Sequence, residues 1–516
     1  MKTFTNKRWT VADGCGVAGV FNNTAASWPN TKPITNGKMV EEGQVAEAKL
    51  ATWPQLFAAI VVNVNMFAMG SAMVWPAMAL PQLMSADSGL RDRPITVDEA
   101  SWVASLLQLS TIPFIPLVAA ASAHVGRKML GYATPTLLLA SLIIQMFSTS
   151  IEALYISRVL AGVQCAACLM LTTLYVSETT SDEVRGSLAC MQPLMCNSGI
   201  LFAYIIGAFL PYYVVLYVNV VPVAIFWICF AFMPETPYRL ASTHRYQEAR
   251  KALRWLRRGI SDEQVEREME RIRASLVGDG TQDGGAGRVT LKEICSRAPL
   301  KGFANITILG ANMQLCGSFA VLNYAVMMFD EAGGSVPSEV ATIILGALQV
   351  VGTLVSALVI DRLGRRPLLF LSNGVVGTSV AILGVYMYLK QEMEVDLSSF
   401  GWLPATCLSI YCLTLAAGLN ALPYVVLAEI VAPRIRPVAA IIMYTILPGS
   451  STIISKLYPT MSETMGAYGA FWFFAAVCLV CALIECWLLP ETKGRPLEDI
   501  IKELSGAKDV IINNSQ

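Results

Sequence analysis

Long apolar runs separated by short polar segments make up most of this 516-residue chain. A helix needs roughly 20 predominantly apolar residues to cross the hydrocarbon core of a bilayer. By that measure the runs predict twelve membrane-spanning helices. These fall at about 55–77, 100–122, 129–149, 153–175, 188–210, 213–233, 302–328, 340–360, 367–389, 402–427, 438–459 and 467–489. The pattern therefore predicts an all-α membrane protein.

The polar motifs between the runs occur twice, in the same order in each half of the chain. They are Gly126-Arg127-Lys128 and Gly364-Arg365-Arg366, Glu178…Arg185 and Glu429…Arg436, and Pro234-Glu235-Thr236 and Pro490-Glu491-Thr492. A duplicated block of membrane helices is typical of transporters built from two pseudo-symmetric bundles with a substrate path between them. We therefore predict two six-helix bundles, at residues 55–233 and 301–489.

Polar segments flank and connect the two predicted bundles. Residues 1–54 are rich in Asn, Thr, Gly and Ser and predict a disordered tail, and residues 490–516 form a second tail. Residues 234–300 form a linker in which Gln247–Arg258 predicts a helix. Ser261 with Gln264, and Thr290 with Glu293, form capping boxes for two more helices, and the run Gly278–Gly287 between them should be flexible. We expect these helices to pack beneath the bundle, with a regulatory role as the alternative.

Basic residues are concentrated on one side of the predicted bundle. They crowd residues 239–273 of the linker, and the loops at Arg127 and Arg365 fall on the same side. The opposite loops offer little beyond Arg91, Arg93 and Lys390. By the positive-inside rule, both termini and the linker are cytoplasmic. We expect a multi-pass protein of the plasma membrane. The sequons at Asn22, Asn305 and Asn513 would then carry no glycan.

Composition and charge argue against several classes of protein. Apolar residues make up 55% of the chain and charged residues 14%, with a formal net charge of zero, whereas an average soluble domain has about 25% charged residues. The neutral balance argues against nucleic acid as a partner. Most cysteines lie within apolar runs, where they act as small hydrophobic residues. Because no catalytic constellation or metal cluster stands out, we expect neither an enzyme nor a cofactor or metal, and the sequence implies no oligomer.

Charged residues near the ends of the spans are functional candidates, because charges are costly inside a membrane. On the predicted cytoplasmic side, an acid seven residues before an arginine can pair with the neighbouring basic loop motif and close that face. The predicted gate comprises Arg127, Arg158 (deeper in span four), Glu178, Arg185, Glu235, Asp361, Arg365, Arg366, Glu429, Arg436 and Glu491. The alternative is that these side chains only extend to the membrane interface. Their recurrence in both halves favours the gate.

After residue 50, nearly the whole chain resembles the sugar porters of the major facilitator superfamily. The motifs that carry the resemblance are Ser101-Trp102, Gly126-Arg127-Lys128, Tyr175-Val176-Ser177-Glu178, Arg185-Gly186, Pro234-Glu235-Thr236-Pro237, Asp361-Arg362-Leu363-Gly364-Arg365-Arg366 and Pro490-Glu491-Thr492-Lys493-Gly494. Trp75-Pro76, Leu80-Pro81 and Asn197-Ser198-Gly199-Ile200-Leu201 are most similar to the facilitated trehalose and hexose transporters of insects. The resemblance implies a sugar carrier whose two bundles rock about a central site and expose it alternately to each side.

The predicted sugar site departs from the family pattern. Met313 and Phe319 stand where sugar porters carry a Gln and an Asn, and Tyr424 replaces a Trp that stacks on the sugar. Leu447-Pro448 replaces an Asn-Trp pair, and Ala123 replaces an Asp of the loop motif. Each lost polar partner costs roughly 1–3 kcal/mol. The remaining candidates for substrate binding are Gln314, Asn323, Tyr324, Gln349, Asn420, Tyr424, Asn63 and Asn65.

Proton coupling needs a titratable acid in the substrate path. Span one has Phe67-Ala68-Met69-Gly70 where proton-coupled relatives carry an Asp, so we predict passive transport. Glu485 in span twelve is interpreted as a packing or lipid-interface residue. The alternatives to a sugar carrier are a transporter-like sensor and an orphan carrier of a less polar, non-sugar small molecule.

Overall fold

The computed structural model describes residues 52–85, 93–280, 295–432, 435–493, 495 and 497–505. Residues 51–516 form one compact unit, whose described elements are helices. Of the predicted N-terminal tail, only its last residues belong to the described part of the chain.

Among the described residues, the first half of this unit has eight helices and the linker has three. They are α2 (Trp53–Met73), α3 (Trp75–Leu83), α4 (Val97–His124), α5 (Arg127–Phe147), α6 (Ile151–Thr179), α7 (Asp182–Ala189), α8 (Met191–Phe209) and α9 (Tyr212–Ala231), then α10 (Pro237–Ser242), α11 (Tyr246–Leu256) and α12 (Asp262–Gly280).

The second half continues with α14 and ends with α21. Its elements are α14 (Arg297–Leu315), α15 (Ser318–Ala332), α16 (Ser338–Leu363), α17 (Arg365–Gln391), α18 (Leu403–Thr414), the π-helical turn η3 (Leu415–Leu419), α19 (Leu422–Ile430), α20 (Arg436–Leu488) and α21 (Leu497–Ser505). A short 3-10 turn, η2 (Ser398–Phe400), precedes α18.

The described residues contain 11 helical segments long and apolar enough to cross a membrane. The last of them, Val438–Leu488, has 51 residues and contains Gly466, whose backbone is not helical at φ 73° and ψ 158°. It therefore comprises two spans, residues 436–465 and 467–488, which we call the first and second arms of α20. The prediction of twelve spans in an all-α membrane protein is confirmed.

Three spans that the apolar pattern predicts as continuous helices are broken. Span one splits into α2 and α3 at Val74, because Pro76 lacks the N–H that would continue the helix. Span seven splits into α14 and α15 at Gly317, whose φ of 96° is a left-handed conformation that favours glycine. Span ten splits into α18, η3 and α19, with Pro423 at the start of α19.

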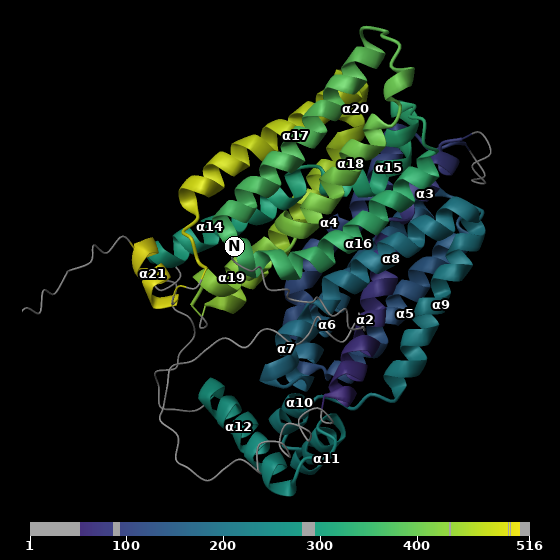
Figure 1. The fold of residues 1–516 in the computed structure, drawn as a ribbon. Helices are drawn as coiled ribbons and strands as arrows, with labels where there is room; N and C mark the ends of the chain where they lie inside the picture. The colour runs from purple at the N-terminus through teal and green to yellow at the C-terminus, as the bar shows by residue number, and fades with distance from the viewer. Residues whose placement is uncertain are drawn as a thin grey trace, which may run out of the picture. The chain divides into compact units, whose positions relative to one another are not determined.

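The two halves share one packed interface. Across it α4 packs against α20, α8 against α16 and α3 against α15, and Figure 1 shows α8 running beside α16. Gly346 on α16 lets the backbones approach, since a Cβ there would lie 3.3 Å from Cα of Leu201 and 3.0 Å from the Tyr204 ring. The largest hydrophobic cluster draws buried residues from both halves, including Leu80, Tyr204, Tyr324 and Phe474.

The linker helices are attached to the end of α6. Ser261 and Gln264 form the predicted capping box at the start of α12, with backbone-to-side-chain bonds of 3.0 and 3.3 Å. Arg257 after α11 donates from Nη1 to the carbonyl oxygen of Thr179 at 2.7 Å, which holds α11 against the bundle. The predicted helix after Thr290 and Glu293, and most of the run Gly278–Gly287, lie outside the described residues.

Candidate substrate path and charged rim

The two Gly-Arg motifs lie at the same end of the bundle. Asn197 of α8 bonds to Thr353 of α16, and the two helices are antiparallel, so the end of α16 lies beside the start of α8. Gly364 directly follows the end of α16, and the start of α8 is at the same end of the first half as the start of α5. We call this the basic end, defined by Arg127 at the start of α5 and Arg365 at the start of α17. The opposite end is the one where α4 and α6 begin.

A first cluster at the basic end joins α5 to α6. Arg127 donates from Nε and Nη2 to Oε1 of Glu178, at 3.2 and 2.6 Å, and from Nη1 to the carbonyl oxygen of Ser122 at 2.5 Å. The Thr236 hydroxyl donates to the other oxygen of Glu178 at 2.5 Å. The Glu178 side chain is only 10% exposed, so water weakens this charge-assisted pair little.

A second cluster repeats this arrangement between α17 and α19. Arg365 donates from Nε and Nη2 to the two oxygens of Glu429, at 3.1 and 2.6 Å, and from Nη1 to the carbonyl oxygen of Ile360 at 3.1 Å. The Thr492 hydroxyl donates to Glu429 at 2.5 Å. Here the acid is 27% exposed. The predicted repeat in sequence is thus a repeat of hydrogen bonds, and the threonine's part in it was not foreseen.

A carboxylate also sits at the start of α5 and of α17. Glu235 accepts the first two backbone N–H groups of α5 at 3.0 and 3.1 Å, and Glu491 accepts those of α17 at 3.1 Å each. An anion at a helix N-terminus is favoured by the exposed N–H groups and the helix dipole. Burial alone would raise the pKa of Glu491, but the backbone N–H donors of Lys493, Arg365 and Arg366 together hold this pKa below its usual value.

Three further predicted rim arginines donate to backbone carbonyl groups. Arg185, Arg436 and Arg366 each donate from Nη2 to a carbonyl oxygen. Those carbonyls belong to Thr180 at 3.3 Å, Ala428 at 2.9 Å, and Cys486, respectively. Asp361 lies in α16, and its side chain is outside the described part of the structure.

Arg158 lies at the opposite end, which corrects its grouping with the cytoplasmic gate. It is near the start of α6 while Glu178 is near the end, roughly 30 Å away at 1.5 Å per residue. The buried guanidinium donates to the carbonyl oxygens of Val103 at 3.1 Å and Ala72 at 2.9 Å. It also lies 5.5 Å from the centre of the Trp75 ring, so carbonyl dipoles and an aromatic face stabilise its charge.

Three predicted pocket residues lie on either side of the break in span seven. Gln314, near the end of α14, accepts a hydrogen bond from the Ser318 hydroxyl of α15 at 2.7 Å. Asn323 and Tyr324 both reach Ser455 of α20, with Nδ2 of Asn323 at 3.5 Å from its hydroxyl and the Tyr324 hydroxyl at 3.0 Å from its carbonyl oxygen. All three predicted residues are buried.

Several buried amide oxygens remain without a partner. Among the described residues, Oδ1 of Asn323, Oε1 of Gln349 and Oδ1 of Asn420 accept no hydrogen bond. Gln349 lies on α16 one turn before Thr353, which accepts a bond from Nδ2 of Asn197 on α8 at 2.7 Å. Tyr424, the first-turn residue of α19 predicted to line the site, is exposed.

The two predicted residues of span one have different hydrogen-bond partners. Asn65 donates to the Thr134 hydroxyl of α5 at 2.8 Å and accepts from Nε2 of Gln164 on α6 at 3.4 Å. These bonds hold Asn65 inside the first half, away from the residues of α14, α15 and α16. Asn63 donates to the carbonyl oxygen of Ala59 at 2.8 Å, and its Oδ1 has no partner within the described chain.

Hydrogen bonds between the halves were not foreseen from the sequence. The Tyr204 hydroxyl of α8 donates to the carbonyl oxygen of Leu322 on α15 at 2.9 Å. Lys456 on the first arm of α20 donates to Oδ1 of Asp98 at 2.6 Å and to the Ser101 hydroxyl at 2.8 Å, both near the start of α4. The last two bonds lie at the opposite end. None of these residues belongs to a repeated motif, so the duplication gave no signal for them.

Glu485 is buried rather than facing lipid, which agrees with the packing alternative and contradicts the lipid-interface alternative. The side chain is on the second arm of α20 and is 3% exposed. Nδ2 of Asn312 and Nδ2 of Asn373 each donate to one carboxylate oxygen at 2.9 Å, which ties α14 and α17 to this arm. Among the described residues, no group of three or more His, Cys, Asp and Glu side chains is placed to hold a metal ion.

Comparison with known proteins extends over most of the chain. A family model described as "Sugar (and other) transporter" matches residues 51–504. The facilitated trehalose transporter Tret1 of Bombyx mori is 31% identical over 90% of this chain and 89% of its own length. Tret1 of Drosophila willistoni is 29% identical over 88% of this chain, which spans about half, 51%, of that longer relative.

Solved structures of similar fold are also known. The inward-open conformation of the xylose transporter XylE from E. coli superposes with a TM-score of 0.70 over 86% of this chain and 98% of that one. At 18% identity this likeness shows the fold alone.

Proposed function

The chain belongs to the sugar (and other) transporter family, the sugar porters of the major facilitator superfamily, and on that premise we propose that it carries a sugar across the membrane. It is a multi-pass membrane carrier and not an enzyme. The substrate is of the trehalose or hexose class, and the transport is facilitated diffusion by alternating access. The facilitated trehalose transporters among its relatives support this choice of substrate and mode.

The observation that carries the proposal is the set of buried amide oxygens without donors. Asn323, Gln349 and Asn420 each present one such oxygen, Asn323 and Gln349 from helices of the second half and Asn420 from the turn between η3 and α19. A buried acceptor that lacks a donor costs roughly 1–3 kcal/mol. A sugar carries many hydroxyl donors, so its entry would satisfy these oxygens and offset the cost of stripping water from the sugar. Gln314 beside the break in span seven adds a fourth polar group.

Apolar substitutions around these groups set the expected affinity. Phe319 is buried at the start of α15, and Met313 packs against the hydrophobic cluster formed by α14, α19 and the first arm of α20. Neither offers a hydrogen bond to a hydroxyl. We therefore propose a sugar site with fewer polar partners than is usual in sugar porters, and weaker binding of hexoses.

The rim is proposed as the gate at the cytoplasmic face. Each charged cluster joins helices of one half only. Lys456–Asp98 and Tyr204–Leu322 join the halves near the opposite end, and Asn197–Thr353 joins them farther toward the basic end, within α8 and α16. This distribution is expected of a carrier in which each half moves as a rigid body. The rim clusters would hold the helices of each half together while the halves move. Both termini and the linker are proposed to be cytoplasmic in the plasma membrane, with the predicted boundaries at residues 54, 233, 300 and 489.

Uptake in transport-null cells tests the substrate. Cells expressing the chain are expected to take up radiolabelled trehalose, glucose or fructose, and Gln314→Ala should raise the half-saturation constant. Met313→Gln with Phe319→Asn should increase hexose or trehalose uptake, while Met393→Gln, at an exposed position after α17, serves as the matched control. Sugar binding without uptake would instead support a sensor. No binding, with no gain from the double substitution, would point to a less polar substrate.

Epitope tags test the orientation. Tags at either terminus should be labelled only after the cells are permeabilised, because basic segments stay on the cytoplasmic side. Labelling of an N-terminal tag on intact cells would reverse the assignment of the basic end.

A further inference from the structure

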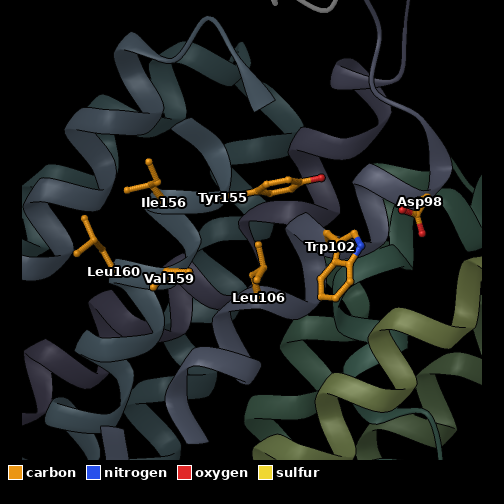
Figure 2. Close-up of a pocket in the computed structure, with 7 residues that line it drawn as sticks. All are labelled: Asp98, Trp102, Leu106, Tyr155, Ile156, Val159 and Leu160. Atoms are coloured by element: carbon orange, nitrogen blue, oxygen red, sulfur yellow. The ribbon is translucent and has the colours of Figure 1, made fainter. Parts of the chain in front are cut away.

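A groove runs along α4 and α6 outside the substrate path. Its wider part has a volume of about 580 Å³, with Asp98, Trp102 and Tyr155 at one end and Leu106, Val159 and Leu160 along its length, as Figure 2 shows. A second cavity of about 420 Å³ continues it between Leu106, Val159 and Phe114. From Asp98 to Phe114 the groove follows α4 for about 24 Å.

The position of the groove makes membrane lipid its neighbour. Both helices that line it are membrane spans, and the apolar side chains at its edge are exposed, with Ile156 at 56%. An apolar surface of this kind on a membrane span faces hydrocarbon. One leaflet supplies about half of the roughly 30 Å core of a bilayer, so the groove is long enough to hold an acyl chain along its full depth.

The polar end of the groove carries one positive and one negative group. Asp98 is 75% exposed and accepts from Nζ of Lys456, whose side chain is 26% exposed. The Lys456 ammonium also lies 4.3 Å from the centre of the Trp102 ring, so an ammonium group is already held there by a carboxylate and an aromatic face. In Figure 2 the Tyr155 hydroxyl is directed toward Trp102, on the side of the groove where Asp98 lies.

We propose that this groove binds a zwitterionic phospholipid of the surrounding bilayer. One acyl chain lies along Leu106 and Val159, the ammonium of a choline or ethanolamine headgroup contacts Asp98 and Tyr155, and the phosphate contacts Lys456. Phosphatidylglycerol has a net negative charge and no ammonium for Asp98, and that carboxylate repels its headgroup. A sterol hydroxyl matches only one of the two charged groups.

The bound lipid also contacts the junction of the two halves. Asp98 belongs to the first half and Lys456 to the second, and their pair lies at the opposite end. When that end opens, the pair must separate, and the headgroup then provides a counter-charge for each partner. This lipid therefore favours the state in which the opposite end is open. The inference does not depend on which substrate is carried.

Native mass spectrometry of the purified full chain tests the proposal. Protein in detergent is mixed with equal amounts of phosphatidylcholine, phosphatidylethanolamine and phosphatidylglycerol that share the same acyl chains. One choline or ethanolamine lipid should be retained with about fivefold preference over the glycerol lipid. Equal retention of phosphatidylglycerol by the unmodified protein would overturn the headgroup assignment.

Two variants test the apolar part of the groove and its polar end separately. Val159→Trp obstructs the groove where its two cavities meet and should reduce the retained lipid about fivefold, whereas Leu117→Trp, exposed on α4 outside the groove, should leave it unchanged. Asp98→Asn keeps the shape and should remove the headgroup preference, so it decides the matter if Val159→Trp does not fold. Unchanged preference in Asp98→Asn, or equal losses in the two Trp variants, would contradict the site.

Discussion

The charged clusters at the ends of the two halves have the same bonds but different surroundings. In each, an arginine donates to a glutamate by two nitrogens, and a threonine hydroxyl donates to the same glutamate at 2.5 Å. The glutamate of the first half is 10% exposed, and that of the second half is 27% exposed. The duplicated motifs therefore determine the local network, and the segments packed around it determine how far water reaches it.

Those surrounding segments are not duplicates of each other. The linker helices cover the first cluster, with Arg257 bonded to the end of α6 and Arg239 to the carbonyl oxygen of His124. At the second, α21 packs on α14 and α19 and buries Ile500 and Leu504. The Arg–Glu pair should therefore contribute more to the free energy of unfolding in the first half than in the second, because charge pairs shielded from water are screened less.

The largest effects are expected from charge reversal at these acids. Glu178→Lys should lower the free energy of unfolding by about 3–5 kcal/mol, because it leaves the buried Arg127 unpaired, and Glu429→Lys should lower it by about 1–2 kcal/mol. Both should slow the transport cycle more than they weaken ligand binding, since the acids lie at the rim. Thermal melts, ligand binding and uptake of the purified or expressed variants measure the three quantities.

A matched control exists on the second half. Arg495 and Glu503 form an exposed pair, and reversing both charges together should change the melting temperature little. The double reversal Arg365→Glu with Glu429→Arg should recover part of the loss of Glu429→Lys. Equal or greater destabilisation by Glu429→Lys than by Glu178→Lys would show that shielding does not distinguish the two clusters.

Contacts between distant segments could be predicted from the sequence where their motifs recur. Glu178 and Arg127 could be paired in advance because both belong to motifs that return together. The grouping of Arg158 with the cytoplasmic gate is wrong. The order of the spans would have shown this, because span four begins at the opposite end and Arg158 is among its first residues. The partners of Glu485 could not be predicted, because Asn312 is 173 residues away and nothing marks which apolar helices meet.

The breaks in the first span of each half form a second contrast. The first half breaks beside Pro76, whereas the second breaks at Gly317, at a φ of 96°. A Cβ on Gly317 would lie 2.6 Å from the buried ring of Phe474. An apolar pattern shows neither the backbone angle nor that ring, which is why span seven was predicted as one helix.

Gly317→Ala should therefore destabilise the protein by about 2–3 kcal/mol, through backbone strain and the clash with Phe474. Pro76→Ala should cost less than about 1 kcal/mol, because alanine adopts the conformation of proline without strain. Thermal melts compare the two. Adding Phe474→Leu to Gly317→Ala should restore part of the lost stability. If Gly317→Ala alone melts at the same temperature as the unmodified protein, the break does not require glycine.

Away from the rim, the two halves bury side chains of opposite charge. The first half buries Arg158 against carbonyl oxygens, and the second buries Glu485 against two amides. Glu485→Leu leaves Nδ2 of Asn373 without its acceptor, while Nδ2 of Asn312 keeps its bond to Oδ1 of Asn373 at 2.9 Å, and the substitution should cost about 1–2 kcal/mol. Glu485→Gln keeps an acceptor and removes the charge, so it should cost less than half as much. Chemical denaturation of both variants in detergent measures the difference. A Gln variant less stable than the Leu variant would mean that the ionised carboxylate itself holds α14 and α17.

The smallest effect concerns the carboxylate at the start of α17. The pKa of Glu491 is lowered from 4.5 because backbone N–H groups stabilise its charged form more than burial disfavours it. Its contribution is therefore complete above pH 4.5 and is lost as the pH falls through the lower folded value. Because the side chain is only partly buried and water screens its charge, that contribution is about a few tenths of a kcal/mol. Glu491→Gln should make the fall in melting temperature between pH 5 and pH 3 shallower, whereas Glu463→Gln, at an exposed position on α20, should leave the slope unchanged. The same slope in both variants would show that the carboxylate of the second half stabilises its helix no more than a surface charge does.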